Sequence, residues 1–293
     1  MTRHHRSGRT VTRHHRAGRT VTHRRLVRLA AALAAVTTLA LVGCSSSPAK
    51  NAAGGPTPTV RGLTQDDAAL LAQTLYKNTE QKGASFSLTT AFANGPTIHV
   101  QGALGWASNR GEATITVGAD QPFDISWGSN AVLEQHAALA GALGKLKAGA
   151  TWLARPANEQ EVPLDRLLKL LSGLATNQPD NPTLVQQQQA GFVRNDTLSG
   201  HAVKVFRYGV RNLYFVGADD GLLYRLEAYL NGFTAATVID LSGWGPQTQR
   251  GPKSAEVVSV TDPDAAAAYA SFTATSALLK PIKAVPAAVT TTT

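Results

Sequence analysis

The sequence predicts an α+β fold, a single domain in which antiparallel strands form two blocks, with helices before and between them. Short segments of β type recur at intervals of roughly ten to twelve residues, each closed by Gly, Asn or Pro, which is typical of an antiparallel meander. Helical periodicity is confined to a few segments with recognisable beginnings. About 250 residues follow Cys44, a length that one domain of this class can hold.

The first block begins with a helix. Thr64 and Asp67 have the spacing of a capping box, and one apolar stripe follows (Ala68, Leu71, Ala72, Leu75, Tyr76). Gly83 is expected to supply the left-handed residue that ends this helix. Four strands are then predicted, over residues 84–93, 97–106, 111–118 and 122–128.

The middle of the chain is predicted to be more helical. A helix is expected over 131–143, with Leu133, Ala137 and Ala140 on one side. Pro163 opens a stronger helix whose leucines recur every three or four positions (Leu164, Leu167, Leu168, Leu171, Leu174). Asn181-Pro182 begins a short glutamine-rich helical turn that ends near Gly191.

The second block returns to strands, and Asp220-Gly221 is a strong hairpin signal because both residues accept a positive φ. The strands are expected over 202–208, 213–216, 222–230, 234–241 and 255–260. Asp262-Pro263-Asp264 caps a last helix, with Tyr269, Phe272 and Leu279 on one seam. The sequence thus predicts about nine antiparallel strands in two blocks.

The segment before the domain has the features of a leader. Residues 1–23 hold a basic ten-residue repeat with few apolar side chains, which we expect to be disordered; an over-long start, a repeat expansion or a nucleic-acid tail could each account for it. Residues 24–43 join arginines to an apolar run, Leu29–Val42, as in a secretory signal. That run is shorter than the ~20 residues of a membrane span.

The rest of the chain divides at changes of composition. Residues 44–62 are rich in Ser, Pro, Gly and Thr and are expected to be a flexible tether. The folded domain is expected over 63–280, and a disordered tail over 281–293.

Charge and cysteine content exclude several functions. The net charge of +9 lies in the leader, where nine arginines precede Cys44, and the remaining chain has 19 basic and 19 acidic residues. A neutral body is not expected to bind nucleic acid. Cys44 is the single cysteine, so there is no internal disulfide or Cys-based zinc site, and the three histidines of the body (His99, His136, His201) fit no local ligand motif. We expect no metal and no cofactor.

The signal ends in Leu41-Val42-Gly43-Cys44, which resembles the lipobox of bacterial lipoproteins. That resemblance implies that the Cys44 thiol is lipidated and that cleavage makes Cys44 the mature N-terminus. The alternative is an ordinary signal peptide with a chance cysteine. The lipobox interpretation predicts attachment to the extracytoplasmic face of the cell membrane.

Three phrases of the second strand block, HAVKV at 201–205, DDGLLYRLE at 219–227 and DLSGWG at 240–245, together with the lipobox, resemble the LppX/LprG family of actinobacterial lipoproteins, which share the LolA/LolB-like fold. The resemblance implies a curved half-barrel sheet with helices on its concave face, enclosing a hydrophobic cavity. It also implies that the ligand is a lipid or glycolipid with acyl chains.

The leading hypothesis is therefore a non-enzymatic, monomeric, membrane-anchored lipoprotein that binds or carries lipid. The residues expected to line its cavity are Phe86, Leu88, Ile98, Val100, Ile115, Val117, Leu167, Leu171, Val203 and Val205; the alternative for each is ordinary core packing. A second hypothesis is a scaffold or sensor lipoprotein that contacts another envelope protein. A third, a hydrolase, would need a Ser/His/Asp cluster that only the fold could reveal, since no G-x-S-x-G elbow is present.

Overall fold

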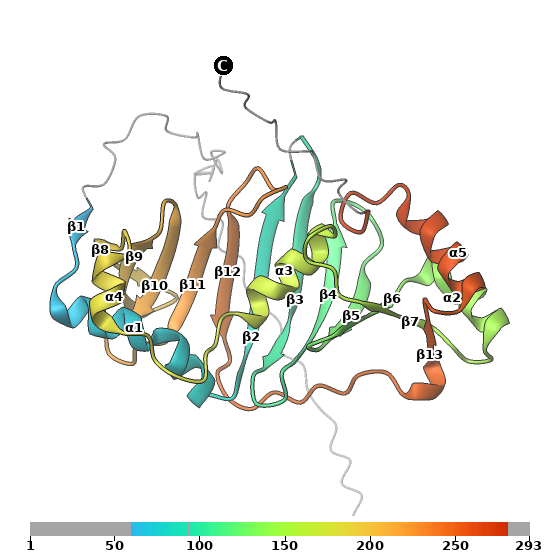
Figure 1. The fold of residues 1–293 in the computed structure, drawn as a ribbon, viewed down its shortest axis with the longest axis horizontal. Helices are drawn as coiled ribbons and strands as arrows, with labels where there is room; N and C mark the ends of the chain where they lie inside the picture. Colours follow the sequence, from blue (N-terminus) through green and yellow to red (C-terminus); the bar gives the residue numbers. More distant parts are fainter. Residues whose placement is uncertain (1–59, 93, 281–293) are drawn as a thin grey trace, which may run out of the picture. The chain divides into compact units, whose positions relative to one another are not determined.

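The computed structural model describes residues 60–92 and 94–280, and these residues form a 13-stranded sheet that does not close on itself (Figure 1). The first meander runs through β2 (Gly83–Ala91), β3 (Thr97–Gly105), β4 (Arg110–Val117), β5 (Phe123–Trp127), β6 (Ala131–Gln135) and β7 (Trp152–Pro156). The second runs through β8 (Gly191–Leu198), β9 (His201–Tyr208), β10 (Asn212–Gly217), β11 (Leu223–Ala228) and β12 (Thr237–Ser242). Strand β12 pairs with β2, so the two blocks make one sheet. The predicted α+β class is confirmed.

Two short strands complete the edges. Strand β1 (Arg61–Gly62) pairs with β8, so two residues assigned to the tether take part in the sheet. Strand β13 (Val257–Ser259) follows a turn of 3-10 helix (Ser254–Glu256) and pairs with β7 in parallel. The expectation of about nine strands, all antiparallel, is therefore wrong on both counts.

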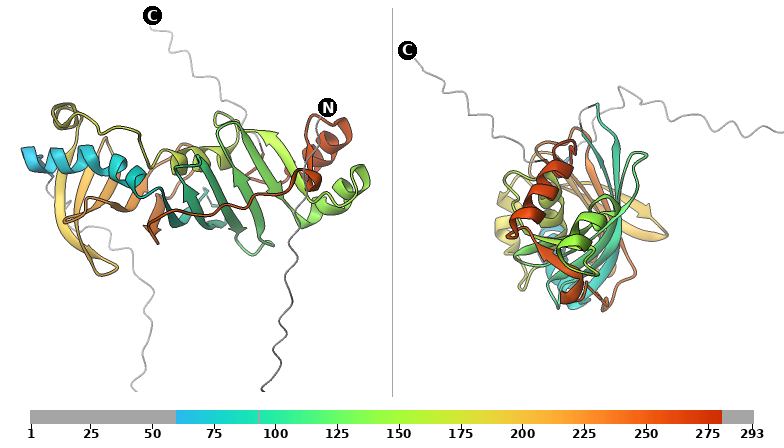
Figure 2. Two further views of the ribbon diagram at one scale, coloured as in Figure 1. Left: turned by 90° about the horizontal axis from the view of Figure 1, so that it is seen from below. Right: turned by 90° about the vertical axis from the view of Figure 1, so that its right-hand side faces the viewer.

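Five α-helices lie in the described part of the chain: α1 (Gln65–Glu80), α2 (Ala137–Leu146), α3 (Pro163–Ser172), α4 (Pro182–Gln187) and α5 (Pro263–Thr273). The Thr64–Asp67 capping box is present, with the Asp67 amide donating to Thr64 Oγ1 at 3.1 Å. Helices α1 and α4 lie beside β8–β11, and α3 crosses β2–β4 (Figure 1). Helices α2 and α5 lie together at the opposite end of the sheet from α1 (Figure 2).

The main core lies between α3 and the middle of the sheet. Leu164, Leu167 and Leu171 have no exposed surface, and they share one apolar cluster with Leu88 and Ile115. Burying a leucine side chain contributes about 1.5–3 kcal/mol. This apolar face of α3 therefore holds the helix against the sheet.

The helix predicted over 131–143 is wrong in its first part, which is strand β6. Val132, Glu134 and His136 are buried and alternate with partly exposed neighbours, as the period of a strand requires. Pairing with β5 and β7 satisfies the backbone of this segment. Strands β7 and β8, which we did not predict, extend the same sheet.

The end of α1 also differs from the prediction. Lys82, not Gly83, adopts the left-handed conformation, with φ 68°. Gly83 begins β2, and a Cβ there would collide with the Leu104 carbonyl oxygen. The glycine is needed for close approach of the strands, not for the helix cap.

Candidate functional site

A pocket of about 490 Å³ opens at the end of the sheet where α2 and α5 lie; we name it the α2–α5 pocket. It is bounded by the turn after β4, the start of β5, the first turn of α2, and the end of α5 with the residues that follow it. Ten of its fifteen lining residues are apolar: Pro96, Val117, Pro122, Phe123, Ala137, Ala138, Phe272, Ala277, Leu278 and Leu279. The polar ones are Asp120, Gln121, His136, Thr275 and Ser276. A mostly apolar cavity with a few polar groups is typical of small-molecule sites.

Helix α5 and the segment that follows it form one wall of the pocket, and this wall is fixed at both of its ends. Asp262 caps α5 through the amides of Asp264 and Ala265, at 3.0 and 3.1 Å. Past the helix, the Leu278 carbonyl accepts the Leu164 amide of α3 at 3.1 Å. Leu278 and Leu279 are consequently buried, and this segment closes one side of the pocket.

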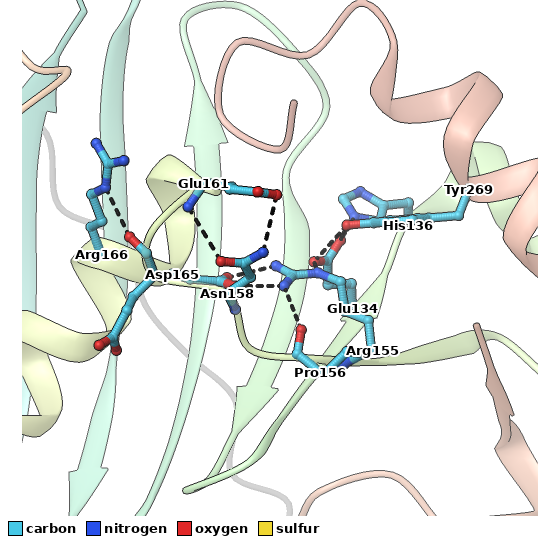
Figure 3. A network of polar contacts seen from close by, with 10 residues as sticks. Glu134, His136, Arg155, Pro156, Asn158, Glu161, Asp165, Arg166 and Tyr269 are labelled. Atoms are coloured by element: carbon cyan, nitrogen blue, oxygen red, sulfur yellow. Dashed lines mark hydrogen bonds and ion pairs between the residues drawn. The ribbon is translucent and has the colours of Figure 1, made fainter. Parts of the chain in front are cut away.

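Behind the pocket lies a buried ionic network in which three side chains converge on Glu134 (Figure 3). His136 Nε2 lies 2.8 Å from Glu134 Oε2, Arg155 Nε donates to Oε1 at 2.5 Å, and the Tyr269 hydroxyl lies 3.1 and 3.2 Å from the two oxygens. Glu134 itself has no exposed surface. The network thus joins β6, β7 and α5.

Arg155 extends this network to α3. Its Nη1 and Nη2 each donate to one Asp165 oxygen at 2.7 Å, a bidentate pair. Asp165 also accepts the Asn158 amide at 2.6 Å. The guanidinium is therefore shared by two carboxylates and has its geometry fixed on both sides.

The electrostatics of the network favour an ionised Glu134. Burial alone would raise the pKa of Glu134, but the hydrogen bond from His136 and the charge of Arg155 together hold it below its usual value. Burial, and then the Glu134 charge, raise the pKa of the Tyr269 hydroxyl. Tyr269 consequently stays protonated and donates to the carboxylate.

The ten predicted cavity residues are all buried or partly buried, but they do not surround one space. Seven of them belong to the main core cluster with α3: Phe86, Leu88, Ile98, Val100, Ile115, Leu167 and Leu171. Val117 packs at its edge and lines the α2–α5 pocket. Their role in lipid binding stays a prediction.

The other two candidates, Val203 and Val205, lie on the opposite face of the sheet. The residue between them, Lys204, points to α1, where its Nζ lies 3.1 Å from Asp67 Oδ1. Both valines belong to a separate cluster with Phe215 and Tyr224. Cys44 and the leader lie outside the described residues.

Sequence reasoning did not identify Glu134, Arg155 or Asp165 as a group, and it gave His136 no role. One signal was available: a strand period over 131–136 places Glu134 and His136 on the same face as Val132. A charged residue in such a buried position needs a partner. The partners themselves come from elements far apart in the chain and carry no common motif.

Other pockets of the described residues differ in character. One of about 430 Å³ lies on the face of the sheet away from α3, beneath residues 250–251, and includes Gln101, Glu112 and Asp124. The α2–α5 pocket is larger, and a larger share of its lining residues is apolar. No group of three or more potential metal ligands occurs among the described residues, and none of the helices described has the length and apolar character to span a bilayer.

Comparison with known proteins gives structural likenesses only. No family model and no curated protein matches the chain.

Among solved structures, the Mycobacterium tuberculosis lipoprotein LppX is 9% identical over 63% of this chain and 97% of its own, with a TM-score of 0.42. A LolA superfamily protein from Nitrosomonas europaea is 10% identical over 64% of this chain and 95% of its own, with a TM-score of 0.26. Pseudomonas aeruginosa MucB, solved with MucA, is 11% identical over 64% of this chain and 60% of its own, with a TM-score of 0.31. LppX and the LolA superfamily, both named by the sequence resemblance, are thus among the structures that this chain is similar to.

Proposed function

We propose that this protein binds a lipid acyl chain in the α2–α5 pocket. The observation that carries the proposal is the pocket itself, about 490 Å³ with walls formed by Val117, Phe123, Phe272 and Leu278. This volume lies within the range of about 300–1,000 Å³ common for small ligands. Each buried methylene contributes about 0.8 kcal/mol, so about ten would contribute about 8 kcal/mol before the cost of ordering the chain.

The position of the α2–α5 pocket favours a binding site over a part of the packed interior, because the pocket lies beside the main core under α3 and not inside it. The α3 leucines fill the space against the sheet, whereas the α2–α5 pocket is lined by residues of α2, of α5 and the segment after it, and of the turns after β2 and β4. A bound chain would contact the exposed Ala138 and Ala277 as well as the buried leucines. Binding would therefore not require the main core to open.

We also propose that the protein is anchored to the extracytoplasmic face of the cell membrane by lipidated Cys44. This rests on the lipobox at Leu41–Cys44 and on the neutral body. Metabolic labelling with an alkyne analogue of palmitate tests it. Label is expected on the full chain and absent from Cys44→Ser; equal labelling of the two would overturn the anchor.

Lipid binding is tested by extracting the purified full chain with organic solvent and identifying lipids by mass spectrometry. We expect about one acyl chain per protein, and loss of it in Ala138→Trp, which fills the pocket. Ala148→Trp, at an exposed position after α2, is the matched control. Retention of lipid in Ala138→Trp would contradict this site, and recovery of a bound protein without lipid would favour the scaffold hypothesis.

A further inference from the structure

His136 occupies a position that local structure does not explain. It is the N-cap of α2, where Ser, Thr, Asp or Asn is preferred because a short side chain can accept an amide of the first turn. The His136 side chain forms no such cap bond. A residue that departs from the local preference and is at the same time buried in a polar network is a candidate for a functional role.

The ring of His136 is held in one orientation. Its two faces lie against Phe123 and Phe272, with ring centroids 4.2 and 4.5 Å apart, and its Nε2 lies 2.8 Å from Glu134. An ionised carboxylate can only accept hydrogen bonds. Nε2 therefore carries a hydrogen, and in the neutral imidazole Nδ1 is left as an acceptor.

Nδ1 is the nitrogen that is free to meet a ligand. It forms no hydrogen bond with the described residues, and it is not among their buried unpaired polar atoms, which are in Trp106, Arg207 and Trp244. His136 lines the α2–α5 pocket and the small pocket beside it. The pocket thus presents a fixed acceptor next to apolar walls.

The surrounding charges disfavour an anionic ligand. The pocket lining includes Asp120 and no Lys or Arg among the described residues. Arg155, which belongs to the network behind the pocket, is only 6% exposed and already binds Glu134 and Asp165. Because two carboxylates share this guanidinium, its positive charge is already neutralised within the network.

Building on the acyl-chain function proposed above, we propose that His136 is the specificity-determining residue of the pocket, and that its Nδ1 accepts a hydrogen bond from a neutral, hydroxyl-bearing head group. The ligand class is a single-chain ester of glycerol or a similar polyol. Fatty-acid anions and phosphate esters are disfavoured, because the described lining of the pocket includes the Asp120 carboxylate and no Lys or Arg.

A series of ligands with one chain and different head groups tests this. We compare monododecanoylglycerol, methyl dodecanoate and dodecanoate by isothermal titration calorimetry on the full chain at neutral pH. One hydrogen bond is expected to make the glycerol ester bind about tenfold more tightly than the methyl ester, and dodecanoate is expected to bind most weakly. In His136→Phe, which keeps an aromatic ring between Phe123 and Phe272, the preference should vanish while methyl dodecanoate binds as before. His99→Asn, at an exposed strand position, is the control and should keep the preference.

A second variant keeps the proposal falsifiable if His136→Phe does not fold. In Glu134→Gln the carboxamide can donate to Nε2, which moves the imidazole hydrogen to Nδ1 and turns the pocket acceptor into a donor. The ¹⁵N shifts of His136 should show the change of tautomer, and the preference should move toward methyl dodecanoate, whose carbonyl accepts. Equal binding of all three ligands by the wild type, abolished by Ala138→Trp, would overturn the role of His136 and leave the acyl-chain site intact. Absence of binding for every ligand would overturn both.

Discussion

The middle of the sheet and its α2–α5 end are held together by different interactions. In the middle, α3 packs leucines with no exposed surface against the sheet, and the contacts are apolar. At the α2–α5 end, a buried cluster of Glu134, Arg155, Asp165 and Tyr269 joins four elements, and a pocket opens in front of it. The first region is thus stabilised by apolar packing and the second by buried ion pairs, and the pocket opens in the second.

Removing the charge of Arg155, which Glu134 and Asp165 share, should cause the largest loss of stability at the α2–α5 end. Arg155→Met leaves Glu134 and Asp165 buried without their counter-charge, which is expected to lower the free energy of unfolding by about 3–5 kcal/mol. Lys169→Met breaks an exposed pair with Glu159 at 3.6 Å and should cost less than about 1 kcal/mol. Urea denaturation of both variants measures the difference. Similar small losses in the two would show that the network does not stabilise the fold.

Truncating one residue in each region compares packing directly. Leu171→Ala removes a side chain without exposed surface and should cost about 2–5 kcal/mol. Val117→Ala, in the wall of an open pocket, should cost about 1 kcal/mol or less, because the lost methyl groups already border a space. Thermal and urea unfolding test this. A larger loss for Val117→Ala would mean that the pocket is part of the core.

The smallest expected effect is on the pH dependence of stability. Because the pKa of Glu134 is lowered on folding, its contribution is complete above the ordinary value of 4.5 and is lost as the pH falls through the lower folded value. Glu134→Gln should therefore flatten the fall in unfolding free energy below pH 4.5. Glu80→Gln, at the exposed end of α1, is the control. An unchanged slope in Glu134→Gln would contradict the assignment of an ionised Glu134.

The same two regions show how far the sequence could predict this structure. The capping box of α1, the leucine repeat of α3 and the Asp262 cap are local signals, and these helices begin where the sequence predicts. Strand β6 was missed because its Leu133, together with Ala137 and Ala140 of α2, also fits a helical period. Its identity depends on pairing with β5 and β7, which is not encoded locally.

The candidate site was harder to predict for a geometric reason. The alternation of side chains along a strand places Val203 and Val205 on one face of the sheet and Lys204 on the other. It does not tell which of these two faces the helices cover. The ionic network depends on residues 134, 136, 155, 165 and 269, which only the fold brings together. Periodicity could identify apolar residues, yet it could not separate the filled middle from the pocket at the end.

Photo-crosslinking is the most direct test of acyl-chain binding at the α2–α5 end. The full chain is irradiated with a monoacylglycerol that carries a diazirine in its acyl chain, and the adducts are located by peptide mass spectrometry. We predict adducts within residues 117–123 and 272–279, and their loss in Ala138→Trp. Adducts confined to residues 98–100 and 164–171 would place the ligand between the sheet and α3 and contradict binding in the α2–α5 pocket.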